Sequence, residues 1–192
     1  MPSNRRDFVK SASAALAAPL FVPRSAWGAN DRVTYGLIAT GGRGRYLNDK
    51  FQKLGAQCVA LCDVYEPYLD QARKQSPDAK PYLDYNELLQ HQGMDAVVIA
   101  SPDHQHYPML MASLEAKKDV YAEKPLSKSL EESQKMIQAV QKSKQVVQVG
   151  MQRRSAESIM KAKALVDDGV LGRITHVRPQ WHWNIAIGCE NS

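Results

Sequence analysis

The chain has 192 residues, of which 44% are hydrophobic and 23% charged, a composition that supports a buried core and excludes a disordered chain. Its formal net charge is +5, but residues 1–29 alone hold four basic residues and one acidic residue. The remaining 21 basic and 19 acidic residues nearly balance, so we expect no nucleic-acid partner.

The N-terminal 29 residues are typical of an export signal. The stretch "SNRRDFVK" is followed by the Ala-rich apolar stretch "SASAALAAPLFV" and by "PRSAWGAN", whose small residues suit a peptidase. Arg5, Arg6, Phe8, Val9 and Lys10 resemble the twin-arginine export signal of bacteria. This resemblance implies recognition by the twin-arginine export machinery and a periplasmic or otherwise exported protein. An amphipathic N-terminal helix is the alternative, and no apolar stretch is long enough for a permanent membrane span.

From Arg32 onward, short apolar runs alternate with segments of helical period, which is typical of a parallel sheet covered by helices. The predicted strands are Val33–Ala39, Gln57–Asp63, a weak one at Pro81–Leu83, Asp95–Ser101, Asp119–Ala122 and Val146–Gly150. The predicted helices are Arg45–Leu54, Pro67–Gln75, Tyr85–Gln90, Pro108–Ala116, Leu130–Lys142 and Ala156–Asp168. We therefore expect an α/β fold over residues 30–152, with a Rossmann-type, doubly wound and mostly parallel sheet.

Residues that favour helix ends flank several of these segments. Gly55 follows the first predicted helix, Ser129 and Glu132 form a capping-box pattern at the fifth, and Ser155 precedes the sixth. Beyond Gly169 the stretch "RITHVRPQWHWN" alternates like a half-exposed strand. Residues 153–192 are thus predicted to form a linking helix and the first strand of a second α/β substrate domain. Because such a domain needs many more residues, we expect a longer protein.

The three cysteines do not predict disulfides. Cys58 and Cys62 lie four residues apart in one predicted strand, too far apart for their side chains to be bridged, and Cys189 is the third. We expect buried free thiols. No cysteine spacing of a zinc site is present, and the nearby histidines lack further ligands, so we predict no metal site.

A glycine-rich turn is the strongest local pattern. In "VTYGLIATGGRGRYL" a strand leads into a turn and then a helix, the setting of the dinucleotide-binding pattern G-x-G-x-x-G. Its three positions are Ala39, Gly41 and Gly44, so alanine replaces the first glycine. Together with Gly42 and Arg43, this turn is predicted to bind a diphosphate at the start of the following helix.

Asp63 ends the next predicted strand, in "VALCDV", nineteen residues after Gly44. A carboxylate at this position can accept hydrogen bonds from the adenosine ribose and would repel a 2′-phosphate, which favours NAD. Arg43 and Arg45 leave NADP possible, because either side chain could reach a phosphate.

Two further strand ends are expected at the same edge of the sheet, because ligands of parallel sheets bind beyond the carboxyl ends of the strands. One end carries Ser101, Pro102, His104 and His106, and we expect His106 to face the crevice and His104 to make ordinary helix-start hydrogen bonds. The other carries Glu123, Lys124 and Pro125. Pro125 restricts the two preceding residues to a turn, so Lys124 is either a solvated turn residue or directed at the ligand.

The ordered set "GGRG", "CDV", "SPDHQHYPMLMASLEAKKDVYAEKPLS" and "VGMQRR" resembles the Gfo/Idh/MocA oxidoreductase family, particularly its exported members. The resemblance implies an NAD(P)-dependent oxidoreductase that transfers hydride between a sugar, cyclitol or similar polyol and nicotinamide, and a homo-oligomer in full length. It implies that Lys124 is catalytic and that Glu123, His106, Gln152 and Arg153 lie near the cofactor. His182 is a further catalytic candidate, with an ordinary core or surface position as its alternative.

Two other functions remain open. The same scaffold also supports glycoside hydrolysis through transient oxidation by tightly held NAD, which would proceed without net NADH formation. A non-catalytic dinucleotide-binding protein is the second alternative.

Overall fold

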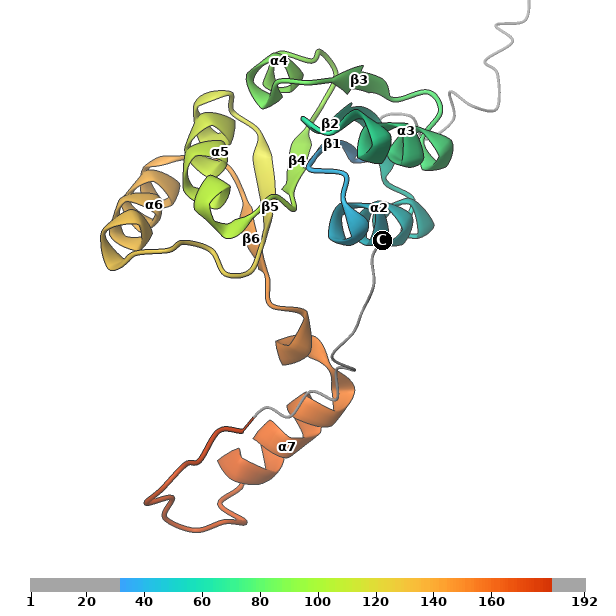
Figure 1. Cartoon of the computed structure of the whole chain (residues 1–192). Coiled ribbons are helices and arrows are strands. Elements are labelled where there is room, and N and C mark those ends of the chain that lie inside the picture. Colours follow the sequence, from blue (N-terminus) through green and yellow to red (C-terminus); the bar gives the residue numbers. More distant parts are fainter. Residues whose placement is uncertain (1–31, 181–192) are drawn as a thin grey trace, which may run out of the picture. The chain divides into compact units, whose positions relative to one another are not determined.

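A computed structural model describes residues 32–180 of the chain (Figure 1), and these divide into two compact units between Gly150 and Met151. The larger unit contains one six-stranded sheet in the order β3-β2-β1-β4-β5-β6, in which all neighbouring strands are parallel. The strands are β1 (Thr34–Ile38), β2 (Gln57–Cys62), β3 (Lys80–Tyr82), β4 (Ala96–Ile99), β5 (Asp119–Glu123) and β6 (Val147–Gly150). The predicted α/β fold of the Rossmann type is confirmed, including its weak third strand.

Helices cover both faces of this sheet, with α2 and α3 on one side and α5 and α6 on the other (Figure 1). The helices of this unit are α2 (Gly42–Lys53), α3 (Glu66–Gln75), α4 (Tyr85–Leu89), α5 (Asp103–Glu115) and α6 (Leu130–Lys142). Leu37 packs into the core beneath α2 and α3, whereas its neighbour Ile38 packs into the core beneath α4, α5 and α6. This alternation follows from the pleat of the strand, and it explains why β1 is apolar on both faces.

Two helices begin several residues earlier than the sequence pattern predicts, and α3 begins one residue earlier, at Glu66. Helix α2 begins at Gly42 rather than Arg45, directly after the glycine turn. Helix α5 begins at Asp103, whereas the sequence pattern predicts its start at Pro108, which lies inside the helix. Pro102 instead takes the N-cap position with extended backbone, and the acidic Asp103 occupies the first turn, where it complements the helix dipole.

The capping pattern at α6 is formed in part. Ser129 Oγ accepts a hydrogen bond from the backbone N–H of Glu132, at 3.1 Å. The Glu132 carboxylate accepts from the backbone N–H of Lys128 at 3.2 Å, one residue before the position of a standard capping box.

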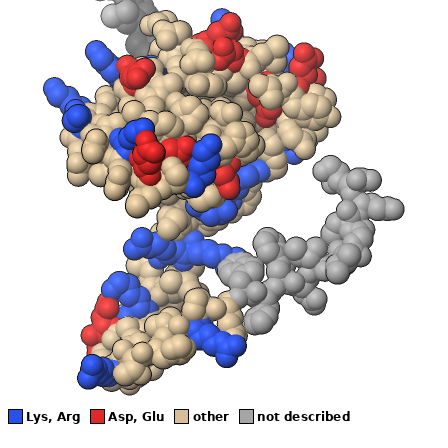
Figure 2. Space-filling model, turned by 60° about the vertical axis from the view of Figure 1, so that its left-hand side comes forward, with Lys and Arg blue, Asp and Glu red and all other residues tan. Residues whose placement is uncertain are grey.

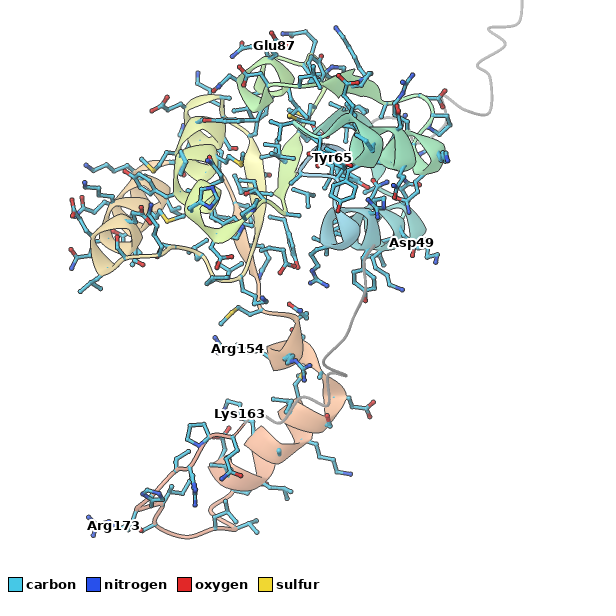
Figure 3. All side chains as sticks on the ribbon, viewed as in Figure 1. Asp49, Tyr65, Glu87, Arg154, Lys163 and Arg173 are labelled. Atoms are coloured by element: carbon cyan, nitrogen blue, oxygen red, sulfur yellow. The ribbon has the colours of Figure 1, made fainter. Side chains whose placement is uncertain are left out.

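The smaller unit contains a 3-10 turn (Gln152–Ser155) and helix α7 (Glu157–Asp167). Figure 3 labels Arg154, Lys163 and Arg173 along this unit, and Lys163 pairs with Asp167 one helical turn away. Ser155 lies within the 3-10 turn and Ala156 is the N-cap of α7, so the predicted Ser155 cap is wrong.

The strand predicted within residues 173–184 is not formed over 173–180, and its remainder lies outside the described residues. A strand is stable only when it pairs with a neighbour, and within residues 32–180 no other strand pairs with this segment.

Basic and acidic side chains lie intermixed on the face of the larger unit shown in Figure 2. This distribution agrees with the nearly balanced charge of the chain beyond its N-terminus. Among the described residues, no helix is long and apolar enough to cross a membrane.

Candidate functional site

The glycine turn connects the carboxyl end of β1 to the start of α2. Ala39 occupies the first position of the pattern in a left-handed conformation, with φ of 69°, and its N–H donates to the carbonyl oxygen of Cys62 at 2.8 Å. A Cβ atom added to Gly44 would lie 2.0 Å from the carbonyl oxygen of Ala39. The third position therefore requires glycine, because helix and turn approach closely there. The first position tolerates alanine, at a conformational free-energy cost of about 1 kcal/mol.

Gly41 and Gly42 are not required by the fold in this way. A Cβ atom added to Gly42 would meet nothing within 4 Å, and one added to Gly41 would meet only the ring of Tyr68, at 3.8 Å. The first hydrogen bond of the helix runs from Arg45 N–H to the Gly41 carbonyl, so the preceding N–H groups have no helical partner. Open backbone whose N–H groups lie at a helix start suits a phosphate group.

Asp63 links the end of β2 to this turn. Its Oδ2 accepts hydrogen bonds from the backbone N–H of Thr40 at 2.6 Å and from Thr40 Oγ1 at 3.0 Å, while its Oδ1 accepts from the backbone N–H of Tyr65 at 2.9 Å. A carboxylate offers about four acceptor positions, so about one remains for a ribose hydroxyl. The side chain thus holds the loop in place and still faces the crevice.

Both arginines near the turn contact protein groups. Arg43 donates from Nε and NH2 to Oε1 of Glu123, at 2.8 and 2.5 Å. Arg45 NH1 donates to the carbonyl oxygen of Thr40 at 2.7 Å, and its guanidinium lies 5.3 Å from the centroid of the Tyr68 ring. These contacts weaken the case for NADP that the two arginines had left open.

A cavity of about 440 Å³ lies at the carboxyl ends of β1, β2 and β4. Its wall includes Asp63, Ser101 and Pro102, as the sequence predicted, together with Asp84 and His104. Ser101 is 8% exposed, and its Oγ has no hydrogen-bond partner among the described residues. A buried hydroxyl that lacks a protein partner beside a cavity fits a polar ligand that supplies one.

The two histidines of α5 exchange their expected positions. His104 lines the cavity, whereas His106 is 1% exposed and does not line it. The ring of His106 lies between two carbonyl oxygens, with Nδ1 2.5 Å from that of Pro125 and Nε2 2.8 Å from that of Ser101. The prediction that His106 faces the crevice is therefore wrong, because two residues are about half a helical turn and place His106 on the face of α5 opposite His104, where main-chain oxygens of the two strand-end loops bind its ring.

Glu123 and Lys124 differ sharply in exposure. Glu123 is 4% exposed, and its Oε2 accepts from the backbone N–H of Lys124 at 3.3 Å, before a cis peptide bond that joins Lys124 to Pro125. The side chain of Lys124 is exposed, and its Nζ has no hydrogen bond or ion pair within residues 32–180. Glu123 is thus the fixed residue of the pair, and Lys124 is available to a ligand.

Tyr121 and Gly150 border the buried Glu123 carboxylate. A Cβ atom added to Gly150 would lie 2.8 Å from the Tyr121 hydroxyl oxygen and 2.9 Å from Glu123 Oε1. Burial raises the pKa of Tyr121, the charge of Glu123 raises it further, and the guanidinium of Arg43 opposes both effects. The hydroxyl therefore remains protonated beside the ion pair.

The structure does not test the roles predicted for three site residues. Gln152 and Arg153 lie in the 3-10 turn of the smaller unit, so their proximity to the cofactor stays a prediction. His182 lies outside the described residues, as does Cys189. Cys58 and Cys62 are buried free thiols, as predicted.

Sequence reasoning missed Thr40 and Asp84 as site residues and gave His104 no ligand contact. Thr40 lies inside the glycine pattern, at a position that the pattern leaves unspecified. Asp84 directly precedes "YNELL", where an aspartate before a helical segment is a recognisable N-cap, and this signal could have placed it at a strand-end loop.

Comparisons with known proteins agree with this geometry. Residues 33–151 match the Gfo/Idh/MocA family model, described as an oxidoreductase family with an NAD-binding Rossmann fold. The chain is 33% identical over 168 residues to an inositol 2-dehydrogenase/D-chiro-inositol 3-dehydrogenase of Lacticaseibacillus casei, a match that covers 83% of this chain and 47% of that protein. It is also 33% identical over 132 residues to an inositol 2-dehydrogenase of Salmonella typhimurium, covering 68% and 39% of the two chains.

Solved structures show the same likeness. The myo-inositol dehydrogenase of Lactobacillus casei in complex with NAD(H) and myo-inositol is similar with a TM-score of 0.68 and 33% identity, covering 73% of this chain and 43% of that one. The apo scyllo-inositol dehydrogenase of the same organism has a TM-score of 0.70 at 29% identity, covering 75% and 44%. The chain thus spans about half the length, or less, of the relatives it matches.

Proposed function

Because this chain belongs to the Gfo/Idh/MocA oxidoreductase family and contains its NAD-binding Rossmann domain, we propose that its protein transfers hydride between a cyclitol or related polyol and nicotinamide dinucleotide. The named relatives support a cyclitol in particular, since the two described above are inositol dehydrogenases. NAD is the preferred cofactor in this proposal, and NADP the less favoured one.

One observation carries the proposal. Three polar features meet at the carboxyl edge of a single parallel sheet: the open glycine turn, the Asp63 carboxylate bound to it, and the Glu123–Lys124 turn joined to it by Arg43. Gly41, Gly42 and the first N–H groups of α2 would hold the diphosphate, Asp63 a ribose hydroxyl, and Ser101 Oγ a further polar group of the cofactor.

The chemistry requires a proton acceptor near the substrate. When bound, the nicotinamide supplies the site that takes or returns hydride. Lys124 extends from a turn whose backbone is fixed by Glu123, and its amine is available to take the proton of a substrate hydroxyl or to return it. Removing that proton as hydride leaves is the role that we assign to Lys124.

Two measurements test this function. Titration of the 192-residue chain with NAD, followed by calorimetry, should show saturable binding at one site. Turnover is measured on the product of the complete reading frame, with myo-inositol and other cyclitols as substrates and NADH formation as the signal. If the chain fails to bind either NAD or NADP, the cofactor role is wrong. If polyols yield no NADH although NAD binds, the dehydrogenase role is wrong.

We also propose that the protein reaches the periplasm through the twin-arginine route and acts there as a homo-oligomer. The pattern of Arg5, Arg6 and Lys10 before an Ala-rich stretch supports export. Replacing both arginines by lysine should leave the protein in the cytoplasmic fraction of a bacterial host, whereas unchanged export would refute this route. Light scattering of the complete protein tests its assembly, and a monomer at all concentrations would refute an oligomer.

A further inference from the structure

We propose that Asp84 is a second determinant of cofactor choice, whose carboxylate acts with Asp63 to disfavour a 2′-phosphate on the adenosine ribose and so selects NAD over NADP. The inference rests on the proposed function, because it concerns the same dinucleotide site. It adds a residue from the loop between β3 and α4, which the glycine pattern and the β2 aspartate do not include.

The sheet brings the two carboxylates to one edge. Cys62 pairs with Tyr82 in the parallel register of β2 and β3, and the N–H of Asp63 donates to the Tyr82 carbonyl at 3.3 Å. Asp63 follows Cys62 directly, and Asp84 lies two residues beyond Tyr82, so both leave adjacent strands at their carboxyl ends. Both side chains line the 440 Å³ cavity.

The cavity wall is negatively charged. Asp63 and Asp84 are its acidic residues, and within the described part of the chain its lining includes no lysine or arginine. His104 is the histidine among the residues that line this cavity. Because a phosphate monoester carries nearly two negative charges at neutral pH, a wall with two fixed carboxylates and no lysine or arginine among its lining residues disfavours it.

One oxygen of the Asp84 carboxylate is available to a ligand in the cavity. Its Oδ1 accepts from the backbone N–H of Asn86 at 2.8 Å and from Asn86 Nδ2 at 3.0 Å, which caps α4. Its Oδ2 has no hydrogen bond to any residue between 32 and 180. The nearby thiol of Cys62 experiences both charges, since its pKa is raised first by burial and then by Asp63 and Asp84.

An independent observation supports a ligand-binding role for this cavity. Ser101 Oγ, from the loop after β4, is buried in the same wall and lacks a partner among the described residues. A polar ligand that satisfies this hydroxyl would lie in the same cavity as both carboxylates, where their charges act on it over short distances.

The test replaces Asp84 by Asn in the 192-residue chain and measures the dissociation constants of NAD and NADP by calorimetry, with all variants in the same buffer. Asparagine caps helices as well as aspartate does, so this variant removes the charge and keeps the cap of α4. We expect the preference for NAD over NADP to fall about three- to tenfold, mainly because NADP binds more tightly. The double variant with Asp63→Asn should lower the preference further.

Asp78→Asn is the matched control, because Asp78 precedes β3 at its amino end and lines a different cavity, with the same change in net charge. It should leave the ratio of the two dissociation constants unchanged. This inference would be overturned if the ratio of the NAD and NADP dissociation constants were unaltered in Asp84→Asn, or if it changed equally in Asp78→Asn. NAD binding in the same experiment would still support the proposed function. If the wild-type chain binds neither nucleotide, both proposals fail. Asp84→Ser, which also keeps a capping oxygen, provides a second uncharged variant.

Discussion

Arg43 on the first turn of α2 donates two hydrogen bonds to one oxygen of Glu123, at the end of β5 and 80 residues further along the chain. The contact joins the glycine turn to the residue directly before Lys124. The Glu123 side chain is almost fully buried while that of Arg43 remains partly exposed, so the guanidinium is the charge partner of a carboxylate inside the protein.

Loss of this pair should destabilise the fold. Replacing Arg43 by Ala leaves a buried carboxylate without that partner, which should lower the free energy of unfolding by about 2 kcal/mol. Lys53→Ala in the same helix removes an exposed ion pair to Asp49 and should cost about 0.5 kcal/mol. Urea denaturation of both variants provides the comparison, and equal losses would contradict the importance assigned to Arg43.

The glycines of the turn should separate stability from binding. Gly44→Ala forces a Cβ atom against the Ala39 carbonyl and should destabilise the chain by about 3 kcal/mol. Gly42→Ala, where space is open, should leave the free energy of unfolding within about 0.5 kcal/mol of wild type. Gly41→Ala should fold normally but bind NAD at least about tenfold more weakly, because the methyl group occupies the surface offered to the diphosphate. Normal NAD binding by Gly41→Ala would place the diphosphate elsewhere.

Lys124 is expected to affect turnover and not cofactor binding. In the complete protein, Lys124→Ala should lower kcat for cyclitol oxidation by about 100-fold or more, since a positioned base is lost. Its dissociation constant for NAD should stay close to that of wild type. Lys128→Ala, which removes a neighbouring lysine that pairs with Glu132, is the control and should retain activity. Near-normal turnover of Lys124→Ala would remove this residue from the mechanism.

The buried thiols should make the fold sensitive to alkaline pH. Burial and, to a smaller extent, nearby carboxylates raise the pKa of Cys62 from 9.0 to about 12. Between these two values the unfolded chain releases the proton and the folded chain keeps it, so the free energy of unfolding falls as pH rises above 9. The loss caused by this thiol should reach about 1 kcal/mol near pH 10.

Cys62→Ala tests this expectation when unfolding is measured near pH 8 and near pH 10. The variant is less stable overall, because a buried side chain is lost, but its stability should depend less on pH than that of wild type. Cys58→Ala should behave similarly, since burial raises the pKa of Cys58 to about 11. An unchanged pH dependence in both variants would show that the thiols do not cause it.

Local sequence patterns predicted the larger unit well. Apolar runs such as that of β4 are buried by helices on both faces, so their composition alone indicates a central parallel strand. Helix starts were harder to predict, because proline is favoured only in the first turn of a helix, whereas α5 begins at Asp103 and contains Pro108 in its interior. The strand predicted after Gly169 depends on a pairing partner, and a local pattern does not contain that information.

The sequence predicted which residues lie at the candidate site better than it predicted the contacts that they make. The glycine turn and Asp63 follow from spacing, because each lies at a fixed distance from a strand end. Which of His104 and His106 faces the cavity depends on the rotation of α5, and a shift of its first residue changes the face on which each lies. The Arg43–Glu123 pair joins residues 80 positions apart, so only the folded chain reveals it.

His106 contacts main-chain oxygens of Ser101 and Pro125 and binds neither side chain. The imidazole therefore fixes the separation of two loops without constraining the chemical identity of the residues that those loops present. Over evolutionary time, substitutions at the loop surface could alter ligand preference while the spacing beneath them is retained. A protein engineer could likewise vary position 101 to change the contacts offered to a ligand and should leave position 106 unchanged.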